Sequence, residues 1–161
     1  MFSVLCFKKL KVMKREIKFR GKNIVTGEWV YGSLVNNLWK YSESHSLFGQ
    51  PVCEIITDEY EGDCWEDIAS QDEKCIVCVI PETVGQYTGL KDKNNVDIYG
   101  GEIIFNDDRN EHAIVTYSEE RAMFICTYAE SNDVFPLWQT LSNLYYSVGN
   151  IYENKNLLTT Q

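Results

Sequence analysis

Apolar and polar residues alternate along most of this 161-residue chain with a period of two. That period is typical of β-strands, whose successive side chains point to opposite faces of a sheet. In the first example, Ile17 and Phe19 alternate with charged residues. The pattern predicts a mainly β protein with strands at 15–20, 28–35, 52–57, 74–80, 83–89, 96–99, 102–105, 112–117, 121–128 and 146–152.

One segment near the C-terminus has a helical spacing instead. Leu137, Leu141 and Leu144 recur three or four positions apart, and they follow Pro136. Proline is favoured at the first position of a helix, so we predict one short C-terminal helix of about two turns here.

The stretch from Val84 to Phe105 predicts a hairpin followed by a sharp bend. Residues 91–95 are polar, and asparagine at Asn95 tolerates the positive φ that a tight turn needs. Gly100-Gly101 then separates two strands with almost no spacer, so the chain must kink there, as at a bulge or a barrel corner. The short strands that follow predict a meander, and with it a small SH3-like barrel.

The length and the 44% hydrophobic content suit a single domain or two closely packed lobes. From Met13 the chain begins a regular strand, whereas the residues before it keep no period, so we expect Met13 to be the natural start. The expected organisation is an N-terminal extension at 1–12 and one domain at 13–158, divided into a hairpin lobe with an acidic loop insert (13–80) and a barrel-like lobe (81–158).

The formal net charge of -9 argues against wholesale binding of nucleic acid. No stretch approaches the ~20 consecutive apolar residues of a membrane span. The apolar run at the start of the chain is followed by lysines, not preceded by them as in a secretory signal. We therefore expect a cytoplasmic protein.

Two segments concentrate charge of opposite sign. The segment from Asp58 to Glu73 holds eight acids and no base, without the spacing of a calcium loop. It is either a solvated insert or an interaction loop in which Tyr60 and Trp65 provide aromatic anchors.

Eight of the 15 basic residues lie in the first 22 positions, and four of them share one face of the first predicted strand: Lys14, Lys18, Arg20 and Lys22. This face is a lysine-protected edge strand, a nucleic-acid contact, or a surface that meets the acidic loop of a neighbouring subunit. The last alternative accounts for both charged segments. The candidate interaction surface accordingly comprises Lys14, Lys18, Arg20, Tyr60 and Trp65.

The sequence offers no recognisable metal, cofactor or catalytic motif. Cys75 and Cys78 have a metal-like spacing, but they lie in a predicted strand that directs their thiols to opposite faces, and zinc needs four convergent ligands. The six cysteines are therefore expected to be buried thiols. The two histidines, His45 and His112, have no partner motif of the catalytic kind.

Three blocks of the chain resemble the YopX-like family of phage and prophage proteins. They are "KREIKFRGKNIVTGEWVYG", "IPETVGQYTGLKDKNNVDIYGGEIIF" and "VGNIYENKNLL". The resemblance implies a mostly β fold, a phage or integrated-element origin and self-association. It implies no established activity and provides no catalytic residues.

The expected function is that of a non-enzymatic phage or prophage accessory protein that binds a phage or host protein as a homo-oligomer. Self-association is expected around Trp138 and Tyr145. The alternative is a nucleic-acid-binding small barrel, in which the basic strand and Tyr87 or Trp29 form the surface. An enzyme of unknown type is the least favoured class, since no motif supports it.

Overall fold

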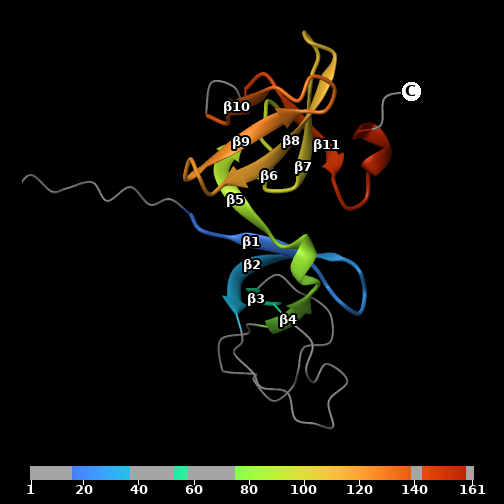
Figure 1. Cartoon of the computed structure of the whole chain (residues 1–161). Coiled ribbons are helices and arrows are strands. Elements are labelled where there is room, and N and C mark those ends of the chain that lie inside the picture. The colour runs from blue at the N-terminus through green and yellow to red at the C-terminus, as the bar shows by residue number, and fades with distance from the viewer. Residues whose placement is uncertain (1–15, 37–52, 58–74, 139–142, 159–161) are drawn as a thin grey trace, which may run out of the picture.

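The computed structural model describes residues 16–36, 53–57, 75–138 and 143–158. These residues form two antiparallel sheets, one above the other in Figure 1. The first has the strand order β4-β3-β2-β1-β5-β6, with β1 (Phe19–Lys22), β2 (Trp29–Asn36), β3 (Cys53–Thr57), β4 (Cys75–Val79), β5 (Gly85–Lys91) and β6 (Asp97–Tyr99). The second has the order β10-β9-β8-β7-β11, with β7 (Glu102–Asn106), β8 (Glu111–Ser118), β9 (Met123–Tyr128), β10 (Val134–Pro136) and β11 (Tyr146–Asn150). The predicted mainly β class is confirmed.

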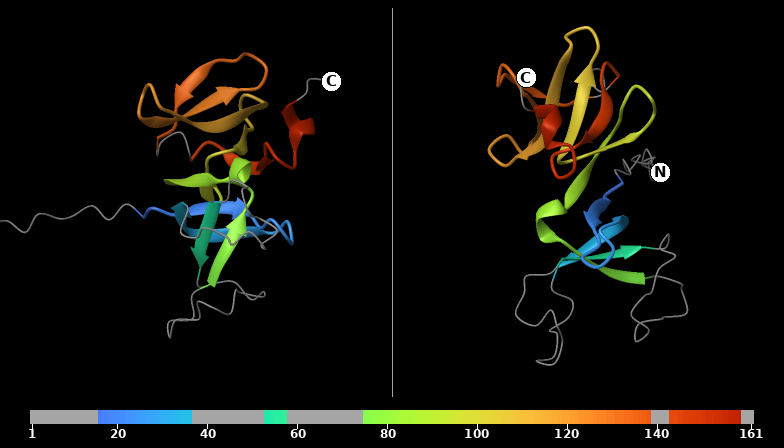
Figure 2. Two further views of the ribbon diagram at one scale, coloured as in Figure 1. Left: turned by 60° about the horizontal axis from the view of Figure 1, so that its bottom comes forward. Right: turned by 90° about the vertical axis from the view of Figure 1, so that its right-hand side faces the viewer.

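Each sheet has its own hydrophobic core. Val30, Ile55, Val77 and Val79 form the core of the six-stranded sheet. The larger core lies mainly on the five-stranded sheet and also includes Ile98 of β6; its buried residues are Ile98, Ile104, Ala113, Val115, Phe124, Cys126, Tyr128, Leu137 and Tyr145. Strand β5 joins the two regions, and Figure 2 shows it running from one sheet toward the other.

The predicted meander is confirmed, because β7, β8, β9 and β10 pair in succession. Both sheets are open, however, and β10 and β11 remain at opposite edges of the five-stranded sheet. The SH3-like barrel is therefore not confirmed.

The predicted C-terminal helix is wrong over the residues that the structure describes. Pro136 ends strand β10, where it pairs with Ile125, and the Leu137 amide donates to the Phe124 carbonyl. Proline is tolerated there because β10 is an edge strand, which leaves the missing N–H without consequence. Of the leucines at helical spacing, Leu137 enters the core from non-helical backbone, whereas Leu144 is 48% exposed. Residues 139–142 lie outside the described part of the chain. The described helical elements are the 3-10 turns η2 (Pro81–Thr83) and η3 (Lys155–Leu158).

The hairpin tip between β5 and β6 has the predicted conformation. Asn95 adopts a φ of 66°. The buried Asp92 carboxylate accepts hydrogen bonds from the backbone amides of Asn94 and Val96, at 2.8 Å each. The turn is therefore held by Asp92 and by the backbone conformation of Asn95.

Replacing Asn95 by glycine should leave the free energy of unfolding within about 0.5 kcal/mol of wild type, or raise it slightly. Glycine adopts the same positive φ without steric cost. Thermal unfolding of the variant measures this directly. A decrease of several degrees would mean that the asparagine side chain makes a contact that stabilises the turn.

The predicted kink at Gly100-Gly101 is also confirmed. It is the place where the chain leaves the six-stranded sheet after β6 and enters the five-stranded sheet at β7. Gly101 has a φ of +84°, a conformation that other L-residues adopt only with strain.

The cysteines differ in part from the expectation of free, buried thiols. Cys53, Cys78 and Cys126 form no disulfide, and the last two are buried. Cys75 is disulfide-bonded, so the expectation is wrong there. Disulfide pairing depends on which segments meet in space and cannot be deduced from cysteine spacing alone.

Candidate functional site

One face of the six-stranded sheet presents the basic residues of the N-terminal strand. Arg20 pairs with Tyr31 and Lys22 pairs with Trp29 across β1 and β2, so each cation lies beside an aromatic residue on the same face. Strand β1 lies between β2 and β5, and the alternative that it is a protected edge strand is therefore wrong.

These cations are paired with acids from later parts of the same chain. The Lys18 ammonium lies 2.5 Å from the Asp97 carboxylate, which also accepts a 2.6 Å hydrogen bond from Lys91. The Arg20 guanidinium lies 2.6 Å from the Glu102 carboxylate, and both side chains are buried. Since Glu102 begins β7, this buried ion pair joins the two sheets.

A third ion pair connects β1 to the segment after β11. The Lys22 ammonium lies 2.8 Å from Glu153, and the Glu153 carboxylate also accepts hydrogen bonds from Trp29 and Asn150. The basic face of β1 is thus directed at the C-terminal half of its own chain.

Aromatic rings surround the cations. The Arg20 guanidinium carbon lies 4.6 Å from the centre of the Trp29 ring and 4.9 Å from that of Tyr99. The Lys18 ammonium lies 4.7 Å from the centre of the Tyr87 ring. At these distances each cation is attracted by the ring electrons. Tyr87 and Tyr99 are buried, and both lie in the six-stranded sheet, so these rings hold the cations against their own sheet.

The carboxylates differ in their response to this environment. Burial raises the pKa of Glu102, although Arg20 and Ser147 act to lower it. Burial also acts to raise the pKa of Asp97, but the hydrogen bonds from Lys18 and Lys91 outweigh it and lower the pKa. For Glu153, hydrogen bonds from Lys22 and Asn150 lower the pKa from 4.5 to about 2.

Acid should therefore destabilise the protein. A carboxylate whose pKa is lowered by folding contributes stability above its unfolded pKa, and that contribution is lost as the pH falls through the folded pKa. For Glu153 the window runs from 4.5 down to about 2, and Asp97 acts in the same direction. Glu102, with its raised pKa, acts in the opposite direction. We expect the melting temperature to decrease as pH falls through this window.

Melting curves at several pH values, recorded for wild type and Glu153→Gln, measure this effect. The variant lacks one of the groups with a lowered pKa and should lose less stability in acid than wild type. An equal decrease in both proteins would exclude Glu153 as a contributor.

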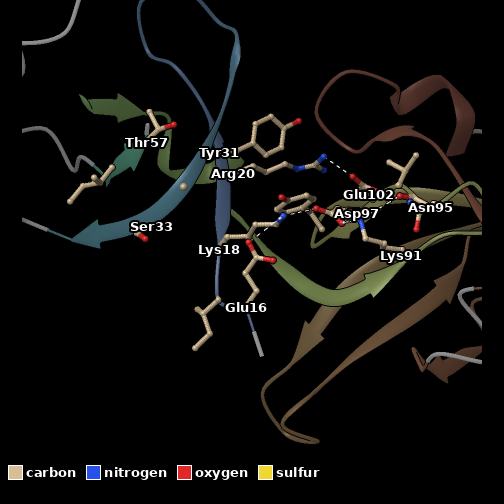
Figure 3. Close-up of a pocket in the computed structure, with 15 residues that line it drawn as sticks. Glu16, Lys18, Arg20, Tyr31, Ser33, Thr57, Lys91, Asn95, Asp97 and Glu102 are labelled. Carbon is tan, nitrogen blue, oxygen red and sulfur yellow. Dashed lines mark hydrogen bonds and ion pairs between the residues drawn. The ribbon is translucent and has the colours of Figure 1, made fainter. Parts of the chain in front are cut away.

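A cleft of about 830 Å³ lies beside these ion pairs, between the basic face of the six-stranded sheet and the β5–β6 hairpin (Figure 3). Three exposed apolar side chains line it: Ile17 is 63% exposed, Tyr31 40% and Val96 51%. The tyrosine ring packs against Tyr99, with the ring centres 5.6 Å apart. The cleft thus combines exposed apolar surface with charged groups that are already paired.

The described residues that line the cleft offer few reactive groups. Its basic side chains, Lys18, Arg20 and Lys91, each pair with a carboxylate. No cysteine or histidine belongs to the described lining. The described residues as a whole contain no group of three or more His, Cys, Asp or Glu residues that would hold a metal ion. His112 lies in β8, half-buried against Phe105, with the ring centres 4.8 Å apart.

Of the residues predicted as an interaction surface, the structure places Lys18 and Arg20 at the cleft. Lys14, Tyr60, Trp65 and the acidic segment lie outside the described residues, as does the N-terminal extension. Sequence reasoning missed Asp97 and Glu102 as their partners. A signal existed at Glu102, because a lone acid opens the apolar strand "GGEIIF", where a buried charge needs a partner.

None of the helices described for this chain is long and apolar enough to cross a membrane. Among solved structures, the chain is similar to protein EF1440 from Enterococcus faecalis, with 24% sequence identity and a TM-score of 0.50. The match covers 89% of this chain and 99% of the other, and it supports the fold alone. No curated protein matches. The sequence model described as YopX protein matches residues 18–159, which include both sheets and all of the cleft lining except Glu16 and Ile17. This chain is a member of the YopX family.

Proposed function

We propose that the protein acts by binding another protein and is not an enzyme, and that the cleft is its binding site. The observation that carries the proposal is the exposure of Ile17, Tyr31 and Val96 beside ionisable groups that pair with one another. Exposed apolar side chains gain free energy when a partner covers them. Paired lysines and carboxylates are poorly suited to act as general bases or nucleophiles.

The biological setting belongs to the same proposal. The family resemblance supports a phage or prophage accessory protein, active in the cytoplasm of the host on a phage or host protein. Nucleic acid is the less favoured ligand, because Lys18 and Arg20 are paired with acids and the chain carries a net charge of -9.

A comparison of two double variants tests the cleft. The cleft variant combines Ile17→Ser with Val96→Ser and removes apolar surface from the cleft. The control combines Val25→Ser with Val134→Ser and removes exposed apolar surface outside the described lining of the cleft. Affinity capture from host cytoplasm, with and without nuclease, should recover the same protein with wild type and the control, but not with the cleft variant. Equal recovery with both variants, or loss on nuclease treatment, would contradict the proposal.

Self-association should occur through the region of Trp138. Tyr145 is buried in the core and is therefore unavailable, whereas Trp138 and Leu144 are half-exposed. Light scattering at micromolar concentration should give a mass above the 18.7 kDa of one chain. Trp138→Ser should shift it toward the monomer. A monomeric wild type would remove homo-oligomerisation from the proposal.

A further inference from the structure

The buried guanidinium of Arg20 has hydrogen-bonding capacity that its protein partners do not use. Its Nη1 donates to Glu102 at 2.6 Å. Its Nε and Nη2 are buried and have no hydrogen-bond partner among the described residues. The side chain is 7% exposed, so bulk water does not satisfy these donors either.

The two unused atoms are adjacent on the guanidinium and lie on the same side of it. Together they form a planar pair of N–H donors whose spacing matches the two oxygens of a carboxylate. The donation to Glu102 comes from the remaining nitrogen. Leaving buried donors unpaired is costly, and a ligand that supplies acceptors recovers that cost.

We propose that the cleft binds an aliphatic carboxylate, with its two oxygens on Nε and Nη2 of Arg20. The inference rests on the proposed function, since it names the chemistry of a ligand for the same cleft. The apolar chain attached to the carboxylate contacts Ile17 and Val96, which are exposed along the cleft. A protein C-terminus that ends in apolar residues has this chemistry, and so does a small branched carboxylic acid.

The charge around the cleft is compatible with an anion. The described lining contains three cations, Lys18, Arg20 and Lys91, and three acids, Glu16, Asp97 and Glu102, and is therefore neutral within a chain of net charge -9. The ammonium groups of Lys18 and Lys91 both contact Asp97, and Lys18 also lies 3.7 Å from Glu16, so these four groups together are neutral.

A ligand reaches Arg20 only if a neighbouring side chain moves, because Nε and Nη2 are buried. Arg20 and Tyr31 are direct partners across β1 and β2, and Figure 3 shows the Tyr31 ring beside the Arg20 side chain. On this proposal the Tyr31 side chain, which belongs to a residue that is 40% exposed, turns outward to admit the carboxylate.

Nuclear magnetic resonance of the ¹⁵N-labelled full chain tests the proposal, because the Nε–H of arginine gives its own signal. The probes are the tetrapeptide acetyl-Ser-Gly-Leu-Val with a free C-terminus, the same peptide as its C-terminal amide, and 4-methylpentanoate. The free-acid peptide should shift the Arg20 Nε–H signal and saturate it. The amide should bind at least about tenfold more weakly, because it lacks the second charged oxygen.

Two variants separate recognition from folding. Arg20→Lys keeps a cation for Glu102 but removes the planar pair of donors, and should weaken the free-acid peptide at least about tenfold. Val96→Ser changes an exposed position and should fold, so it keeps the test informative if Arg20→Lys does not fold. It should weaken binding of the same peptide. Val134→Ser, on β10, should bind like wild type. The proposal is wrong if the acid and the amide shift the same signals equally, or if neither shifts Arg20.

Comparing the binding of the free-acid peptide with that of 4-methylpentanoate identifies the source of the carboxylate. Equal binding of 4-methylpentanoate and the peptide supports a small carboxylic acid, whereas binding of the peptide alone supports a protein C-terminus. Failure of the proposal is distinct from failure of the proposed function. Protein capture that depends on Ile17 and Val96 would stand even if the carboxylate and the amide bound alike.

Discussion

Replacing Glu102 by leucine is expected to lower the free energy of unfolding by about 3 kcal/mol. The variant nearly keeps the size of the side chain but removes its charge together with the oxygens that accept hydrogen bonds from Arg20 and Ser147. The Arg20 guanidinium, 7% exposed, would then be buried without a counterion. Urea-induced unfolding at neutral pH measures the effect.

Glu153→Leu is the matched control. It removes the carboxylate that pairs with Lys22, but that carboxylate is 40% exposed, and a solvated ion pair contributes less than about 1 kcal/mol. A Glu102→Leu variant within about 0.5 kcal/mol of wild type would mean that Arg20 finds another acceptor, and that the ion pair does not hold the sheets together.

The strands could be predicted from the sequence because one face of each is buried. In β9, for example, Phe124, Cys126 and Tyr128 are buried and alternate with half-buried residues, which is the period that the sequence displays. Strand β10 was missed because it has three residues and ends in proline, next to leucines at helical spacing. A segment so short does not establish a period of its own.

The basic half of the site could be predicted, whereas its acidic half could not. Lys18 and Arg20 are close in sequence, and a strand of period two places them on one face. Glu102 lies 82 positions from Arg20 and meets it only through the stacking of one sheet on the other. That stacking depends on the bend at Gly100-Gly101, which the sequence located without indicating which sheets it joins.

The bend between the sheets also requires glycine at position 85. Gly85 begins β5 and pairs with Arg20 on β1, so its missing side chain would point to the cation-bearing face. A Cβ atom there would lie 2.4 Å from the Gly100 carbonyl oxygen, which is far inside van der Waals contact. Because the obstacle is backbone and not a flexible side chain, relief requires that the bend between the sheets move away from β5.

Gly85→Ala should therefore lower the free energy of unfolding by about 3 kcal/mol, at the upper end of the cost of an added methyl group in packed structure.

Gly100→Ala is the matched control on the other side of the same contact. Its Cβ would meet nothing closer than 3.8 Å, and its backbone is outside the positive-φ region, so we expect a change of no more than about 0.5 kcal/mol. Urea unfolding of both variants gives the comparison. Since displacement of the bend also carries Glu102 away from Arg20, Gly85→Ala combined with Glu102→Leu should cost less than the sum of the two single changes. Strict additivity, or equal stability of the two alanine variants, would show that the approach of β5 to the bend does not position the ion pair.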